Sequence, residues 1–216
     1  MVATTVYMLP GLANDHTIFS ELDLQSVNIV HIPWVEPLKK EPIEAYALRL
    51  CDYITTPNPI LIGLSFGGMM AIEIAKHIPT QKIILISSAK GKKEIPFYLR
   101  LLGKTGLQHI VPPSLILAPT PISYWFFGLK EKVQKQKLIY ILQHSSHSIY
   151  KWSLNTLLLW KNTTYPTNVV HIHGTSDRIL PLRFVKADYT IKGGGHFMVF
   201  SHAQQVSVLL LEIINT

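Results

Sequence analysis

The chain has 216 residues and a mass of 24.4 kDa, a length that suits one domain spanning residues 1–216. Apolar residues make up 48% of the sequence and charged residues 15%, which excludes a disordered or collagen-like chain. The formal net charge is +7, and a single cysteine cannot form an internal disulfide, so we expect a reducing, cytoplasmic location.

The first ten residues contain no Lys or Arg and end in the turn that begins at Pro10, which is not the pattern of a signal peptide. Short apolar segments predict six strands, in chain order Thr4–Leu9, Asn28–Ile32, Ile60–Leu64, Lys82–Ile86, Val169–His173 and Asp188–Ile191. Helices are predicted from Pro42 onward, over Phe66–Ile78 and from about Ala203 to Ile214. Near-continuous apolar strands that alternate with helices indicate an α/β fold, with a mostly parallel sheet of about six strands and helices on both faces.

Residues 93–161 contain no convincing core strand, and we interpret them as a helical cap inserted over the carboxyl edge of the sheet. The longest uncharged stretch, Thr105–Leu129, holds four prolines that would break a spanning helix, so no stable membrane insertion is expected. Residues 90–137 carry nine Lys and Arg against two Glu, a difference of +7 that equals the net charge of the whole chain. A solvated helical surface explains such a block, and a surface that steers anionic ligands is the alternative.

The segment Gly63-Leu64-Ser65-Phe66-Gly67 follows an apolar strand and begins a helix, which is the context of a nucleophile elbow. A serine in so tight a turn takes strained backbone angles, and glycines two residues before and after leave room for the neighbouring backbone. The turn also places the Ser65 hydroxyl at the amino end of a helix, where negative charge is favoured. The pattern predicts Ser65 as a nucleophile.

A serine nucleophile needs a base and an acid that orients the base. Of ten histidines, His196 is chosen because it follows three glycines in a loop after the last strand. Asp177 lies in the loop after the fifth predicted strand, whereas the rival Asp188 begins a strand and would point from the wrong end. The order Ser65, Asp177, His196 is the chain order typical of this elbow class.

The oxyanion that forms on attack needs two N–H donors. We assign one to Phe66, directly after the nucleophile, and the other to Leu12, in the turn after the first strand. His16 lies near that turn in the sequence and is a candidate to line the substrate pocket, with a solvent-facing side chain as the alternative.

Four segments resemble the α/β-hydrolase superfamily: LPGL (9–12), GLSFGG (63–68), HGTSDRILP (173–181) and GGHF (194–197). They span nearly the whole chain and are similar to those of small, lid-bearing bacterial carboxylesterases and thioesterases. The resemblance implies a catalytic role for Ser65, Asp177 and His196, and an oxyanion hole at Leu12 and Phe66. Members of the superfamily usually have two further strands at the start, so the resemblance implies a reduced form of the fold.

These residues predict a serine hydrolase of carboxylic esters or thioesters that needs no metal and no organic cofactor. Aromatic residues of the cap, with Trp125 and Phe126 as candidate substrate contacts, suggest an apolar acyl or alkyl group, although packing of the cap explains each one as well. The basic block allows an anionic carrier, coenzyme A or an acyl carrier protein, as a partner, or a membrane-surface role for Tyr124–Phe127. No nucleic-acid motif is present. An acyltransferase or carbon–carbon bond hydrolase on the same triad, and a non-catalytic binding module, are the alternative functions.

Overall fold

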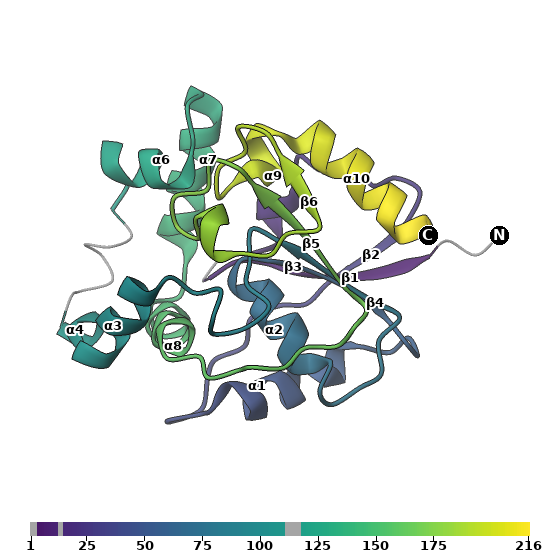
Figure 1. The fold of residues 1–216 in the computed structure, drawn as a ribbon, viewed down its shortest axis with the longest axis horizontal. Helices are drawn as coiled ribbons and strands as arrows, with labels where there is room; N and C mark the ends of the chain where they lie inside the picture. The colour runs from purple at the N-terminus through teal and green to yellow at the C-terminus, as the bar shows by residue number, and fades with distance from the viewer. Residues whose placement is uncertain (1–3, 13–14, 111–117) are drawn as a thin grey trace.

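Six strands form one parallel sheet in the computed structural model, which describes residues 4–12, 15–110 and 118–216 (Figure 1). The sheet has the order β2-β1-β3-β4-β5-β6 and contains β1 (Thr5–Leu9), β2 (Asn28–His31), β3 (Ile60–Leu64), β4 (Lys82–Ile86), β5 (Val169–Gly174) and β6 (Tyr189–Ile191). This confirms the predicted fold class, with strand ends that differ from the prediction by at most one residue. The second strand ends before the predicted Ile32 because the following Pro33 has no N–H to continue the ladder.

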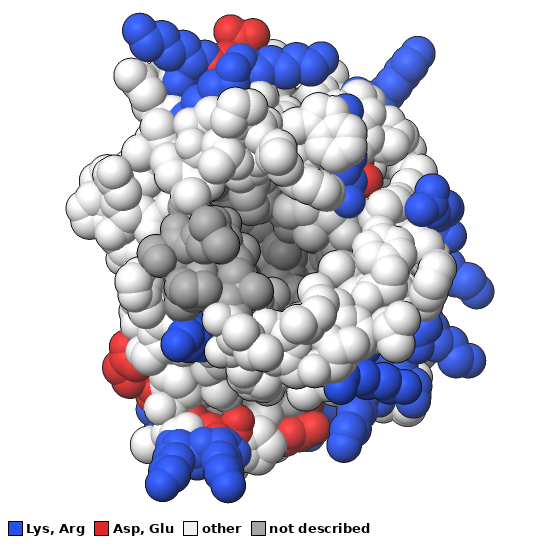
Figure 2. Space-filling model, turned by 90° about the vertical axis from the view of Figure 1, so that its left-hand side faces the viewer, with Lys and Arg blue, Asp and Glu red and all other residues white. Residues whose placement is uncertain are grey.

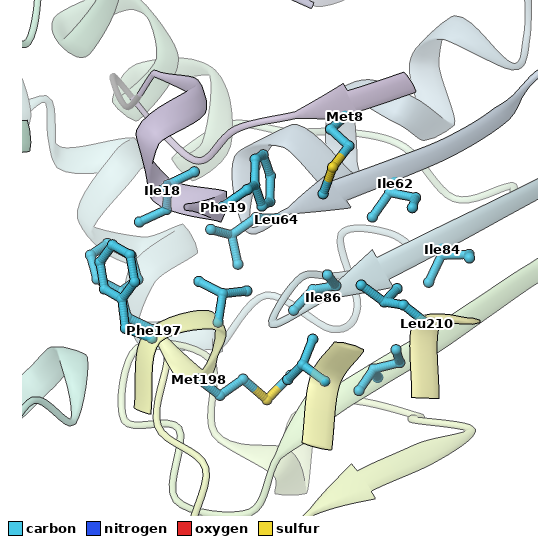
Figure 3. Close-up of a cluster of buried hydrophobic side chains, with 14 of the residues drawn as sticks. Met8, Ile18, Phe19, Ile62, Leu64, Ile84, Ile86, Phe197, Met198 and Leu210 are labelled. Carbon is cyan, nitrogen blue, oxygen red and sulfur yellow. The ribbon is translucent and has the colours of Figure 1, made fainter. Parts of the chain in front are cut away.

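Alternate side chains of each strand enter two cores, one on each face of the sheet. Tyr7 and Leu9 of β1 belong to one core, whereas Val6 and Met8 belong to the other. The first core is covered by α1 (Ile43–Leu50), which continues into η2 (Cys51–Tyr53), and by α2 (Phe66–Ile74). The second is covered by η1 (His16–Phe19), α9 (Met198–Ser201) and α10 (Ala203–Asn215). Figure 3 shows Met8, Ile62 and Ile84 of the strands facing Met198 and Leu210 in this second core.

Helix α2 is shorter than the predicted Phe66–Ile78. Lys76 and His77 make i to i−3 hydrogen bonds to the carbonyls of Glu73 and Ile74, so the chain tightens into a turn ahead of Pro79. Glu73 is fully buried, and its carboxylate accepts hydrogen bonds from Lys76 Nζ and from Trp160 Nε1, both at 2.7 Å. A carboxylate without such partners would be costly at this depth.

The chain between β4 and β5 forms helices that gather on one side of the sheet, at the left of Figure 1. They are α3 (Phe97–Thr105), α4 (Leu107–Ile110), α6 (Pro121–Phe127), α7 (Lys132–His144) and α8 (His147–Leu158). Leu138 and Ile141 of α7 enter one core, and Leu157 and Leu158 of α8 enter the other, which anchors both helices. The remaining short helix, η3 (Leu182–Phe184), lies between β5 and β6. Within the described residues no helix is both long and apolar enough to cross a bilayer.

Candidate active site

Ser65 lies at the carboxyl end of β3 and caps the amino end of α2. Its backbone angles are φ 52° and ψ −118°, a strained conformation for a residue with a side chain. Two hydrogen bonds hold the strained residue: its N–H donates to the Ile86 carbonyl at 2.9 Å, and its carbonyl accepts from Ser88 Oγ at 2.6 Å. Gly67 is required here, because an added Cβ would lie 2.3 Å from the carbonyl oxygens of Leu9 and Pro10. This is the geometry that the sequence pattern predicts for an elbow.

The structure brings the side chains of Ser65, His196 and Asp177 into one hydrogen-bonded row. His196 Nε2 lies 2.9 Å from Ser65 Oγ, and His196 Nδ1 lies 2.8 Å from Asp177 Oδ2. The other carboxylate oxygen, Asp177 Oδ1, accepts hydrogen bonds from the N–H groups of Ile179 and Leu180, both at 2.9 Å. Such a row can move a proton from the hydroxyl to the imidazole.

The surroundings of Asp177 favour its ionised form. Burial alone would raise the pKa of this carboxyl group, but the charge and hydrogen bond of His196, with smaller contributions from His173 and the Leu180 N–H, lower it below its ordinary value. An ionised Asp177 can only accept at His196 Nδ1, so Nδ1 carries the ring proton. Nε2 of a neutral His196 is then unprotonated and faces the hydroxyl of Ser65.

A second histidine, His173 at the end of β5, lies behind Asp177. Its Nε2 is 2.7 Å from the Leu180 carbonyl, which can only accept, and 3.6 Å from Asp177 Oδ2. His173 therefore ties down the loop whose N–H groups hold Asp177. On the other side of the ring, Nδ1 lies 3.2 Å from His171 Nε2. Both histidines were predicted to lie in a buried strand, without a role at the site. The sequence feature that could have indicated a contact between His173 and Asp177 is their spacing of four residues.

The rival carboxylate, Asp188, has other partners. Its Oδ2 accepts a hydrogen bond from the His171 N–H at 2.8 Å and forms an ion pair with Lys90 Nζ at 3.0 Å. Asp188 therefore joins β5 to the segment after β4. Burial, followed by the neighbouring His173 and Lys90, lowers the pKa of His171 well below its ordinary value. Among the described residues, no group of three or more His, Cys, Asp or Glu side chains could hold a metal ion.

Trp34 contacts both segments that carry the residues assigned to the oxyanion hole. Trp34 Nε1 donates to the Gly11 carbonyl at 3.0 Å, and its ring centre lies 5.5 Å from that of Phe66. These contacts hold the turn that contains Leu12 beside the start of α2. Within the part of the chain that the structure describes, no hydrogen bond from the N–H groups of Leu12 and Phe66 is found, and their role as an oxyanion hole stays a prediction.

A cavity of about 340 Å³ opens beside this turn. Pro10 and Trp34 form part of its wall, and His16 lines it while remaining exposed to solvent, so its role as a substrate contact stays a prediction. The ring centre of His16 lies 5.3 Å from that of His31, and burial, together with His16, lowers the pKa of His31. The opposite wall comes from the inserted helices, through Ile141, His144, Ser146 and Ile149.

The aromatic run of α6 is divided between the surface and the site. Trp125 and Phe126 are 56% and 42% exposed, and the Arg178 guanidinium stacks 4.3 Å from the centre of the Trp125 ring. Phe127, which the sequence analysis named within Tyr124–Phe127 but not as a candidate substrate contact, has its ring centre 6.2 Å from that of His196. Its carbonyl accepts the N–H of Phe197 at 3.2 Å, so the end of α6 is fastened to the loop that carries His196. A substrate role for Trp125 and Phe126 stays a prediction.

Comparison with known proteins adds two findings. A model of the "Alpha/beta hydrolase family" matches residues 14–208. Among curated proteins, the chain is similar to a poly(3-hydroxyalkanoate) depolymerase of Ectopseudomonas oleovorans, with 22% identity over 184 residues. The match covers 77% of this chain and 64% of the depolymerase, so the chain spans less than two thirds of that relative.

Solved structures share the whole fold at low identity. An esterase from Exiguobacterium antarcticum matches with a TM-score of 0.72 and 15% identity, covering 100% of this chain and 93% of the esterase. A bromoperoxidase from Bacillus anthracis matches with a TM-score of 0.73, 15% identity and the same coverage. At these identities the likeness shows the fold alone, and the two names illustrate that one fold hosts different chemistries.

Proposed function

The chain belongs to the alpha/beta hydrolase family, and on that premise we propose that it is a serine hydrolase that cleaves a carboxylic ester or thioester. The observation that carries the proposal is the buried row in which Ser65 Oγ, the His196 ring and the Asp177 carboxylate lie at hydrogen-bond distance in sequence. A binding module would have no need of this row. The sequence similarity to a poly(3-hydroxyalkanoate) depolymerase supports the same class of reaction.

In the proposed reaction, Ser65 Oγ attacks the carbonyl carbon while His196 Nε2 takes the hydroxyl proton. The Ser65 ester bond forms, the bond to the alcohol or thiol breaks, and the imidazolium returns its proton to that leaving group. Water then attacks the acyl carbon and gives a proton to His196. The Ser65 ester bond breaks, the acid is released, and the imidazolium returns its proton to Ser65 Oγ. Asp177 stabilises the imidazolium and keeps Nδ1 protonated throughout.

The negative charge on the carbonyl oxygen would be held by the N–H groups of Leu12 and Phe66. Removal of one such donor typically costs about 3–4 kcal/mol of transition-state stabilisation. The site supports this role because Ser65 stands at the amino end of α2, where the helix dipole favours negative charge. The contacts of Trp34 with Gly11 and Phe66 hold both donors in place before substrate arrives.

The substrate proposed has an apolar acyl or alkyl group of modest size. The cavity beside the oxyanion turn, about 340 Å³, is lined by apolar side chains such as Ile32, Ile141 and Ile149 together with His16 and His31. We further propose that residues 93–161 act as a cap over this site, because Ile141 and Ile149 belong to that segment and the end of α6 contacts the His196 loop.

An anionic carrier, coenzyme A or an acyl carrier protein, is the proposed source of a thioester substrate. A cavity of about 450 Å³ supports it, because Lys90, Lys92, Lys93 and Lys186 line it together with the ring of Tyr165. Lys90 is paired with Asp188, whereas the ammonium groups of the other three lysines make no ion pair with any described residue. If cleavage of acyl-coenzyme A is no faster than that of a neutral ester and does not depend on salt concentration, the proposal of an anionic carrier is wrong.

A fluorophosphonate probe tests the hydrolase proposal directly. We expect covalent labelling of the wild-type chain and none of Ser65→Ala, with Ser207→Ala, a buried serine of α10 that does not contact the row, as the control that keeps its label. Hydrolysis of a panel of p-nitrophenyl esters and acyl thioesters then separates hydrolysis from acyl transfer to an added alcohol or cleavage of a carbon–carbon bond. A folded wild-type chain that resists the probe would favour the binding module.

A further inference from the structure

Helices α3, α4 and α6 present large apolar side chains that are mostly exposed to solvent. We use the name cap face for Phe97, Leu101, Ile110, Ile122, Trp125 and Phe126. Ile110 is 76% exposed and Ile122 68%, and the three helices lie on one side of the molecule in Figure 1. Single exposed apolar residues are ordinary, but a set of this size on one side of the molecule is typical of an interaction surface.

The same helices bury very little. None of the residues of α6 is buried, and the buried residue of α3 is Gly103 and that of α4 is Gln108. Amphipathic helices normally turn their apolar stripe to the core. Here, part of the stripe of α3, at Phe97 and Leu101, faces solvent at about 60% exposure.

The distribution of charged residues indicates what kind of partner binds the cap face. Residues 95–130 contain no Asp or Glu, while Arg100, Lys104 and Lys130 lie among or beside the apolar residues. Figure 2 shows this side of the molecule: Lys and Arg side chains lie mostly around its edge, where some Asp and Glu side chains also lie, and the area around the central hollow is largely uncharged. An apolar centre with a cationic border and few carboxylates fits the surface of an anionic bilayer.

A cavity of about 590 Å³ between α3 and the end of α8 has the same character. Its lining combines four cations, Lys92, Arg100, Lys104 and Lys161, with apolar side chains that include Leu101 and Trp160, and no acidic residue contributes to it. The buried Nε of Arg100 has no hydrogen-bond partner among the described residues. A phosphate-bearing lipid headgroup would supply an anion for the cationic side chains that line this cavity.

We propose that the cap face docks on an anionic lipid surface, with its apolar side chains in the boundary between headgroups and acyl chains and its cations against the phosphates. A second copy of the chain fits less well, because a symmetric contact would set the same cations against each other. A folded protein partner would need a groove for side chains that project from three separate helices, whereas a bilayer accepts them without matched shape. The proposal does not depend on the hydrolase activity.

Co-sedimentation with vesicles tests it. We expect the chain to bind vesicles of phosphatidylcholine with phosphatidylglycerol and to bind pure phosphatidylcholine at least about tenfold less. The triple variant Phe97→Ser, Leu101→Ser, Ile110→Ser should lose more than about tenfold in partition coefficient. The matched control is Leu38→Ser, Leu48→Ser, Val208→Ser, which removes side chains of similar exposure elsewhere and should bind as the wild type does.

The charge contribution is measured with Arg100→Gln combined with Lys104→Gln, for which we expect about a twentyfold loss of binding to the anionic vesicles. All binding measurements are repeated with variants that also carry Ser65→Ala. Binding is then measured without the proposed nucleophile, so the result does not depend on whether the hydrolase proposal is correct. Equal binding to both vesicle types, or none to either, would overturn the proposal. The proposal would also be overturned if sedimentation equilibrium showed that the wild-type chain and the control variant are dimers whereas the triple variant is a monomer.

Discussion

Replacing Asp177 with asparagine tests the hydrogen-bonded row at its buried end, and the structure determines which way the new amide points. The oxygen at the Oδ1 position must accept from the N–H groups of Ile179 and Leu180, so it has to remain the amide oxygen. The amide NH₂ then occupies the Oδ2 position, 2.8 Å from His196 Nδ1. Two donors cannot share that contact, so His196 Nδ1 becomes the acceptor and its proton moves to Nε2.

With the proton on Nε2, His196 faces the Ser65 hydroxyl with a donor and cannot take its proton. In serine hydrolases with a triad, this change of tautomer lowers kcat by about 10,000-fold, equivalent to about 5.4 kcal/mol. We expect a loss of that order for Asp177→Asn on a p-nitrophenyl ester, with a much smaller change in KM, because the defect arises at the proton transfer and not in substrate binding.

The matched control is Asp188→Asn, since this rival carboxylate contacts His171 and Lys90 and not His196. It should keep kcat within about threefold of the wild type. Thermal unfolding of both variants shows that each is folded under the assay conditions. A folded Asp177→Asn variant with kcat within tenfold of the wild type would refute the role of Asp177 and the tautomer argument with it.

Gly67→Ala places a methyl carbon 2.3 Å from the carbonyl oxygens of Leu9 and Pro10. We expect the variant to lower the free energy of unfolding by about 1–3 kcal/mol, and to lower kcat because the turn that contains Leu12 is displaced. A urea unfolding midpoint equal to that of the wild type would contradict this expectation. Burial lowers the pKa values of His171 and His173, so both stay neutral in the folded chain when the unfolded chain takes up protons. Their contribution to stability is therefore complete above about pH 6.5 and is lost as the pH falls toward the folded pKa values, by about 1.4 kcal/mol per pH unit for each histidine. Urea unfolding at pH 7.5, 6.5 and 5.5 measures this slope, and a His171→Asn variant with the wild-type slope would speak against it.

The sequence alone determined the elements whose signals are local. Apolar runs bounded by turn residues place the strands within a residue of their observed ends, because a strand buried on both faces needs apolar residues at every position. The glycines around Ser65 identify the turn from the sequence for a similar reason, since the backbone of a tight strand-to-helix turn excludes side chains at those positions. From these patterns one could name Ser65, Asp177 and His196, which the structure places in one row.

Contacts between distant segments were decided only in the tertiary structure. The sequence does not tell that His173 reaches the Leu180 carbonyl behind Asp177, because that contact depends on how the loop after β5 folds back. Nor does it separate Trp125, which lies outside against Arg178, from Phe127, which lies beside His196, since adjacent residues of a helix point in different directions. Composition and periodicity record which residue types are present and how they repeat, whereas partners and exposure follow from the packing of elements far apart in the chain.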